Sequence, residues 1–307
     1  MTIRPLSPEL AEKARIELNE DPKRVASDLQ YIKEWLSKQP YIRARTDDQW
    51  LVSFLRGCKY SLERTKEKLD LFYSLRTLAP ELFNIKHNNP IFEDFLNVGA
   101  YIVLPKTAMP DSPRIAIIRP GTFSTEKLSM SDFFSVTTVI QTILLNEDDT
   151  VVVAGIQWIV DLKDVTIGHL LQMTPRLMKR MTVHSQDAAP FRMKGVHFLN
   201  APAAFEKILG TLKSFLNEKN KNRIFVCRNS EELYKKIPKE ILPQEYGGDS
   251  VSLKEITDYW ITKVKQYSSW LEEDERYGTD ESKRPGQPRT AESLFGVEGS
   301  FRQLDFD

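Results

Sequence analysis

The stretch Ile156-Gln-Trp-Ile-Val160 lies at the centre of the pattern that decides the fold. It is short, apolar and rich in β-branched and aromatic side chains, as expected of a strand that is buried on both faces. Stretches with helical periodicity, at about 131–145, 166–184 and 202–217, separate it from similar runs along the chain. These runs are Tyr101-Ile-Val-Leu104, Ile115-Ala-Ile-Ile118, Val196-His-Phe-Leu199 and Ile224-Phe-Val226. Strands that alternate with helices predict an α/β layer with a largely parallel sheet.

The residues before this layer predict a separate helical module. Ser7-Pro8-Glu9 and Asp21-Pro22 each place a capping side chain before a proline, which is typical of the start of a helix. Two further helices are expected at about 47–57 and 61–79. After Asp21-Pro22, apolar residues recur at helical spacing until Pro40: Val25, Leu29, Ile32 and Leu36.

These patterns divide the chain into four parts. We expect an all-helical module in 1–85, the α/β domain in 86–250 and a C-terminal helix in 251–280. The last part, 281–307, mixes Gly, Pro, Ser and both charges, so we expect a flexible polar tail. Phe295, Phe301 and Phe306 are the apolar residues in it that could anchor it to the rest of the molecule.

Composition excludes several classes of protein. The chain has 307 residues, of which 41% are apolar, enough for a core of ordinary size. Its 43 basic and 43 acidic residues give a net charge of +0, so we expect no nucleic-acid partner. The longest nearly apolar run, 151–162, falls short of the ~20 residues that a spanning helix needs. Two cysteines and an N-terminus without an apolar signal core predict a cytosolic protein.

The common catalytic motifs are missing from the sequence. It contains no nucleophile elbow, no phosphate-binding loop and no dinucleotide fingerprint. Its four histidines show no metal-ligand spacing. We therefore expect no catalytic residues, no metal and no cofactor. The acidic run Glu147-Asp148-Asp149 is interpreted as a solvated turn rather than a cation site.

Basic residues are concentrated in two stretches of the α/β domain. The first contains Arg176, Lys179, Arg180, Arg192 and Lys194, and the second contains Lys213, Lys219, Lys221, Arg223 and Arg228. Two such stretches can present a positive face to an anionic membrane or a phosphorylated headgroup, although solvated helix faces give the same pattern.

Between the basic stretches lies an apolar helix with one wide face: Phe205, Ile208, Leu209, Leu212, Phe215 and Leu216. Core packing, a lipid-filled cavity and a membrane interface all fit that periodicity.

Four motifs resemble those of a known family. Ile241-Leu-Pro-Gln-Glu-Tyr-Gly-Gly248 resembles the Leu-Pro-x-Glu-Tyr-Gly-Gly signature of CRAL-TRIO lipid-binding domains. Gly195-Val-His-Phe-Leu-Asn-Ala-Pro202, Phe54-Leu-Arg-Gly-Cys-Lys-Tyr60 and Val160-Asp-Leu162 resemble three other elements of that family, in the right order. The resemblance implies the CRAL-TRIO fold, in which a sheet floor, flanking helices and a movable gate helix enclose a hydrophobic pocket. The proline, tyrosine and glycines of the first motif themselves indicate a tight, structural turn.

The resemblance also implies a set of ligand-binding residues. Thr138 and Thr142 lie four apart on the pocket helix, where their hydroxyls would meet the polar end of a ligand. The expected walls are Val160, Val165, Met181, His184, Phe191, Met193 and Val196, and the expected inward face of the gate is Phe205, Ile208, Leu209 and Leu212.

A phosphoinositide site is implied beside the gate. Its expected residues are Arg192, Lys194, Lys219 and Arg223, all basic. Cys58 stands where the resemblance places a further basic residue, which weakens the N-terminal side of this site.

We therefore expect a non-enzymatic carrier. It binds one small hydrophobic ligand (a retinoid, a tocopherol or another isoprenoid lipid) and transfers it, as a monomer, at anionic membranes that contain phosphoinositides. Two alternatives stay open. One is a phosphoinositide-binding adaptor or phospholipid exchanger whose tail recruits a partner, and the other is an enzyme that acts on a bound lipid.

Overall fold

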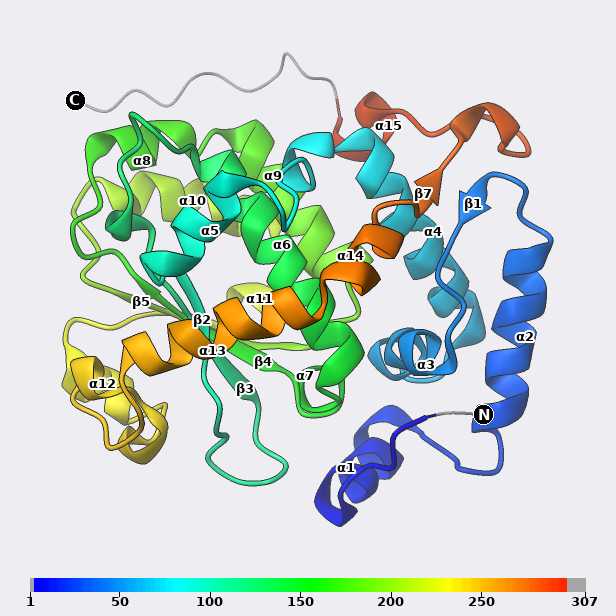
Figure 1. Ribbon diagram of the computed structural model, residues 1–307, viewed down its shortest axis with the longest axis horizontal. Coiled ribbons are helices and arrows are strands. Elements are labelled where there is room, and N and C mark those ends of the chain that lie inside the picture. Colours follow the sequence, from blue (N-terminus) through cyan, green and yellow to red (C-terminus); the bar gives the residue numbers. More distant parts are fainter. Residues whose placement is uncertain (1–2, 297–307) are drawn as a thin grey trace.

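The computed structural model describes residues 3–296, and a five-stranded sheet lies at its centre (Figure 1). The strands are β2 (Tyr101–Val103), β3 (Arg114–Ile118), β4 (Ile156–Asp161), β5 (Met193–Leu199) and β6 (Ile224–Val226). They lie side by side in this order; β2 is antiparallel to β3, and the other neighbours are parallel. The predicted α/β layer with a largely parallel sheet is confirmed.

One irregularity in the sheet brings two side chains of β5 to the same face. Ile156 pairs with Met193 but Gln157 pairs with Gly195, so β5 carries an extra residue at this point. Met193 and Val196 are three apart and would face opposite sides of a regular strand. The bulge allows both to face the same side.

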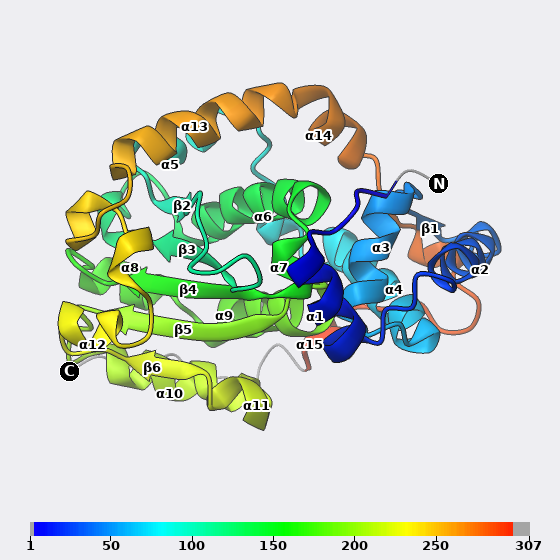
Figure 2. The same cartoon turned by 90° about the horizontal axis from the view of Figure 1, so that it is seen from below.

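Helices cover both faces of the sheet (Figures 1 and 2). On one face lie α6 (Met130–Glu147), α8 (Ile167–Gln172), α9 (Pro175–Thr182) and α10 (Phe205–Phe215), and on the other lies α12 (Ser230–Tyr234). In Figure 2, α13 (Leu253–Gln266) runs along the β2 edge of the sheet, and α10 and α11 (Glu218–Lys221) lie at the β6 edge. Trp260 fastens α13 there, because its indole N–H donates to the Val103 carbonyl at 3.1 Å.

Two predicted helices are interrupted. The stretch 166–184 forms α8 and α9, followed by the π-helix η3 (Val183–Ala188), because Pro175 has no N–H to continue α8 and instead begins a new helix that Thr174 caps. The stretch 252–273 forms α13 and α14 (Ser268–Asp274), which join at Tyr267, where the backbone leaves helical geometry (φ −88°, ψ 2°).

The N-terminal module contains the four expected helices, α1 (Pro8–Leu18), α2 (Val25–Ser37), α3 (Asp48–Gly57) and α4 (Leu62–Leu78). The Ser7 side chain accepts a hydrogen bond from the Leu10 N–H, as an N-cap should. The module is not purely helical, because β1 (Ile42–Arg43) pairs with β7 (Gly278–Thr279) near the other end of the chain. Sequence periodicity cannot reveal a two-residue strand whose partner is so distant.

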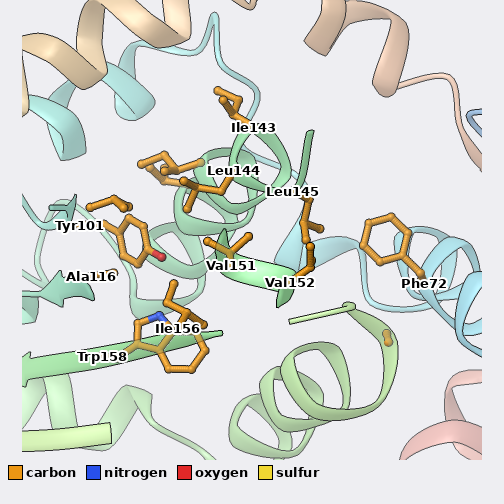
Figure 3. Packing of buried hydrophobic residues seen from close by; sticks show 14 of the residues in the cluster. Phe72, Tyr101, Ala116, Ile143, Leu144, Leu145, Val151, Val152, Ile156 and Trp158 are labelled. Atoms are coloured by element: carbon orange, nitrogen blue, oxygen red, sulfur yellow. The ribbon is translucent and has the colours of Figure 1, made fainter. Parts of the chain in front are cut away.

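Short elements complete the fold. They are η1 (Pro80–Leu82), α5 (Pro90–Asn97), η2 (Pro120–Thr122), α7 (Thr150–Val153), η4 (Lys239–Ile241) and η5 (Gln244–Tyr246). One hydrophobic cluster runs from the module into the α/β domain (Figure 3), including Phe72 of α4, Val152 of α7 and Trp158 of β4. The two parts therefore share a core.

A buried arginine joins the module to the sheet. The Arg56 side chain, from the Phe54-Leu-Arg56 motif, is 2% exposed. Its guanidinium donates to Glu20 at 2.9 and 3.0 Å and to Asp149 at 2.7 Å. Asp149 also accepts from Arg4 and Gln49.

The acidic run is therefore not the solvated turn that we expected. Asp148 pairs with Arg114 at 2.7 Å, and Glu147 pairs with Lys263 at 2.5 Å. All three acidic side chains of the run bind basic partners that are distant in sequence.

The expectation of a flexible tail is corrected for the part that the structure describes. Residues 281–296 include η6 (Glu281–Lys283) and α15 (Ala291–Phe295). Arg284 donates to both oxygens of Asp70 at 2.8 and 2.9 Å and lies over the Tyr41 ring. Phe295 is buried, with the Arg180 guanidinium 4.9 Å from the centre of its ring. Residues 297–307, with Phe301 and Phe306, lie outside the described residues.

We predict that Arg56→Met lowers the free energy of unfolding by about 3 kcal/mol, because the nearly buried carboxylates of Glu20 and Asp149 both lose the guanidinium, although Asp149 keeps Arg4 and Gln49. Urea unfolding of the purified protein measures this. Arg15→Met is the matched control, since Arg15 is 63% exposed and pairs with the exposed Glu12, and it should leave the midpoint unchanged. A loss of less than ~1 kcal/mol in the Arg56 variant would show that this bridge does not join the two parts.

Candidate functional site: an apolar cavity with a basic rim

An apolar cavity of about 220 Å³ lies between the sheet and the helices of the face that α6, α8, α9 and α10 cover. Its floor comes from β4 and β5, its sides from α6, α8, α9 and η3, and its cover from α10. The cavity exceeds the 150 Å³ or so that binds benzene in a protein core, but falls below the ~300–1,000 Å³ typical of drug-sized ligands. To hold a long lipid, the cavity must therefore widen by movement of part of its wall.

The structure brings most of the expected pocket residues to this cavity. Those that line it are Thr138, Val160, Val165, Met181, His184, Met193, Val196, Phe205, Ile208 and Leu212. Three others do not line it. Phe191 packs, half-buried, against the main core, and Leu209 lies at the edge of the apolar face of α10, where it packs against the helix's neighbours.

The third exception is Thr142, and it changes the expected polar contact. Thr142 lines a separate, more polar cavity, with Thr138 in the wall between the two. Both hydroxyls also donate to carbonyls of their own helix, Thr138 to Phe134 at 2.9 Å and Thr142 to Thr138 at 2.8 Å. Neither hydroxyl proton is therefore available to a ligand in this arrangement.

Sequence reasoning missed several wall residues. Trp158 and Phe198 line the cavity, each two positions from a residue that was expected there, Val160 and Val196. The alternation of side chains along a strand was the signal that could have found them. Further wall residues come from outside the expected set: Tyr101, Phe133, Phe134, Gln141 and His169.

The gate helix α10 has few attachments. Only Phe205 and Ile208 are fully buried within it, and its N-cap, Ala204, has no side chain that could accept a hydrogen bond. The opposite side, with Glu206, Lys207 and Ser214, is exposed. An element with so few buried contacts can move at low cost.

The four basic residues expected to bind phosphoinositides lie close together at the β6 side of the sheet. We call them the rim. Arg192 precedes β5, Lys194 lies within it, Lys219 lies on α11 and Arg223 precedes β6. Glu17 of α1 binds the first two, at 2.6 Å from Arg192 and 3.5 Å from Lys194.

The backbone also holds two of these side chains. Arg192 donates to the Val153 carbonyl, and Arg223 donates to the Met193 carbonyl. The rim cations are therefore positioned before any ligand arrives.

The N-terminal module contributes positive charge to the rim. Burial lowers the pKa of Lys219, and the nearby charges of Arg223, Lys59, Arg192 and Arg64 lower it further. Lys59 and Arg64 are exposed residues near the buried Cys58. They supply positive charge on the N-terminal side of the rim, where Cys58 supplies none. Crowded like charges favour the binding of a polyanion.

The Leu-Pro-x-Glu-Tyr-Gly-Gly stretch has a structural role at the other end of the sheet. The Tyr246 hydroxyl donates to Asp161 at 2.7 Å, and Asp161 also accepts from Asn200 at 2.7 Å. Gly247 has a φ of +68°, and a Cβ on Gly248 would lie 2.0 Å from the Leu242 carbonyl oxygen, so only glycine fits at these positions.

Comparison with known proteins agrees with this geometry. The family model described as CRAL/TRIO domain matches residues 105–248. Alpha-tocopherol transfer protein-like from Mus musculus is 31% identical over 250 residues, which cover 81% of this chain and 72% of that protein. The chain belongs to the CRAL/TRIO family. Clavesin-1 from Rattus norvegicus is 30% identical over 79% of this chain and 69% of that protein.

Two further matches concern the fold of this CRAL/TRIO protein. A family model described as Pinta-like, UBA domain matches residues 21–90, in the helical module. The crystal structure of Sfh5 superposes with a TM-score of 0.50 at 13% identity, covering 87% of this chain and all of that one. Together with the apolar cavity, membership of this lipid-binding family supports a lipid carrier.

Two features are absent from residues 3–296. No helix there combines the length and apolar character needed to cross a bilayer. Nor does this part of the chain gather three or more His, Cys, Asp or Glu side chains as metal ligands.

We predict that Tyr246→Phe destabilises the fold without changing the cavity, because it removes one hydrogen bond to a charged carboxylate. The expected loss is about 1.5–3 kcal/mol in urea unfolding. Tyr259→Phe, at a residue that is 53% exposed, is the control and should change little. A Tyr246 variant of wild-type stability that binds lipid less well would instead assign the motif a role in ligand binding.

Proposed function

We propose that this protein is a non-enzymatic cytosolic carrier of one small hydrophobic ligand, of the retinoid, tocopherol or other isoprenoid class. It would transfer that ligand at anionic membranes that contain phosphoinositides, with no cofactor, no nucleic-acid partner and no need for a second copy of the chain. The observation that carries the proposal is an apolar cavity closed by a weakly attached helix beside a cluster of cations.

The cavity supplies the affinity for an apolar ligand. Removing apolar surface from water contributes about 25 cal/mol per Å², so burying about 400 Å² of an isoprenoid contributes about 10 kcal/mol before the cost of ordering the ligand. Met181 and Met193 provide flexible, polarisable walls that adapt to an irregular shape.

The surface beside the gate supplies the membrane contact. The rim offers guanidinium and ammonium groups to lipid phosphates. Ile167 and Leu171 lie four apart on α8, are 52% and 46% exposed, and can enter the interfacial region of a bilayer. Leu170 of the same helix packs in one cluster with Phe205 and Ile208 of α10, so this contact lies next to the gate.

Transfer requires the membrane to favour the open gate. A ligand that binds only the closed form shifts the protein toward closure, whereas a headgroup that binds better to the open form shifts it toward release. Because α11 follows α10 directly, a phosphate on Lys219 acts at the C-terminal end of the gate.

We predict that Lys219→Ala slows transfer of a bound fluorescent lipid to vesicles containing phosphatidylinositol bisphosphate about fivefold. One cation near an anionic surface is worth about 1 kcal/mol. Its affinity for the lipid should stay unchanged. Lys254→Ala is the charge-matched control, since Lys254 is 81% exposed on α13, at the opposite edge of the sheet. Equal transfer rates for both variants and the wild type would rule out the rim mechanism.

We also predict that Glu17→Gln strengthens binding to the same vesicles. Burial raises the pKa of Glu17, but the Arg192 hydrogen bond and the Lys194 charge outweigh it and hold the pKa at about 2. Its carboxylate is therefore ionised throughout the physiological range and competes with lipid phosphates for two rim cations. Vesicle co-sedimentation at two salt concentrations measures the gain, which should shrink at high salt. Weaker binding by this variant would mean that Glu17 positions the cations rather than masking them.

Organic extraction and mass spectrometry of the purified protein identify the ligand class. A stoichiometric isoprenoid supports the carrier proposal. Phospholipid alone favours the exchanger alternative.

A further inference from the structure

The π-helix η3 places a histidine in the wall of the apolar cavity. Its wider turn follows α9 directly, and both His184 and Ser185 line the cavity. π-Helical turns are rare, and those that do occur are frequently found at functional sites.

A lysine from the N-terminal module holds this turn in place. The Lys68 ammonium of α4 donates to the carbonyls of Asp187 at 2.6 Å and Ala189 at 3.1 Å. These carbonyls lie at the C-terminal end of η3, where an α-helix would leave them unpaired. The position of His184 is therefore fixed from outside the cavity.

The His184 ring has an unused hydrogen-bonding atom. The residue is 7% exposed, and within residues 3–296 no protein group forms a hydrogen bond with its Nε2. Two aromatic rings, Phe83 and Phe72, lie against the imidazole, with centroids 5.6 and 6.3 Å away. A buried polar atom without a partner costs about 1–3 kcal/mol, so this nitrogen, on a residue that lines the cavity, points to a ligand that supplies the partner.

The imidazole is neutral at physiological pH. Burial lowers its pKa, and the positive charges of Arg76 and Lys68 lower it further, to about 4. A neutral imidazole accepts a hydrogen bond at one ring nitrogen and donates one from the other, according to its tautomer. It can therefore pair with a hydroxyl or with a carbonyl oxygen.

Of the other polar groups of the wall, those of His169 and Thr138 are already engaged. Both ring nitrogens of His169 have partners, Thr166 and the Phe123 carbonyl. The Thr138 hydroxyl donates to its own helix. The Tyr101 hydroxyl points toward the Trp158 indole nitrogen (Figure 3), but it too has no hydrogen-bond partner within residues 3–296.

We propose that His184 Nε2 is the hydrogen-bonding point for the polar end of the ligand. The cavity then selects isoprenoid lipids that carry a hydroxyl or carbonyl oxygen over hydrocarbons of the same shape. This inference rests on the carrier function proposed above, and names the chemistry of its ligand.

The test compares three C15 isoprenoids of the same length: farnesol, farnesal and farnesene. Native mass spectrometry of the purified full chain with equimolar pairs measures the preference directly. The wild type should favour farnesol and farnesal over farnesene about tenfold, the effect of satisfying one buried polar atom. His184→Phe should abolish this preference while keeping farnesene binding, and His184→Gln should retain part of it.

Two further measurements exclude a merely structural role. His87→Phe, at a histidine that lines the separate, more polar cavity, is the matched control and should keep the tenfold preference. His184→Phe should also raise the melting temperature of the ligand-free protein, because it replaces an unpartnered polar group with an apolar ring among aromatic neighbours. A lower melting temperature would show that Nε2 is satisfied without ligand, and would overturn the inference.

The remaining outcomes separate this inference from the carrier proposal. If all three isoprenoids bind equally, or if His184→Phe keeps the wild-type preference, the role of His184 is refuted and the carrier stands. If none of them binds to the wild type while a phospholipid does, the isoprenoid carrier proposal fails, and the inference fails with it.

Discussion

The buried guanidinium of Arg56 is the contact on which the arrangement of the whole molecule depends. It joins Glu20 in the helical module to Asp149, which immediately precedes α7. The central strand β4 follows α7. The Val153 carbonyl at the end of α7 in turn accepts from Arg192, which pairs with Glu17 of α1. One polar network thus fixes the module, the sheet floor and the basic rim together, because buried charges must be paired to be tolerated.

The helix that covers the cavity, α10, is attached differently from the strands. Strands β3–β6 are held by parallel ladders, whereas α10 has no N-cap side chain and only two fully buried residues. An element with few buried residues opens at a lower free-energy cost than the paired strands that support it. The C-terminal segment strengthens the support, since Arg284 binds Asp70 and Phe295 packs beside Arg180 on α9.

The glycine signature at 241–248 and the cavity lie in different places on this fold. The glycine signature closes the carboxyl end of the sheet around Asp161, and it makes no contribution to the cavity wall. Many residues of the cavity wall lie outside the signatures, such as His184 and Trp158. The motifs at 160–162 and 195–202 do supply part of the wall, through Val160, Leu162, Val196 and Phe198.

Local pattern alone determined the alternation of strands and helices, the first four helices, the apolar face of α10 and the clustering of basic residues along the chain. These features depend on periodicity and capping, which neighbouring residues encode. The tertiary structure alone decided that Thr142 faces another cavity, that Glu147-Asp148-Asp149 is paired, that Lys59 and Arg64 join the rim, and that residues 281–296 pack. Each of these depends on a partner far away in sequence, and a partner at that distance leaves no periodic trace in the residues around it.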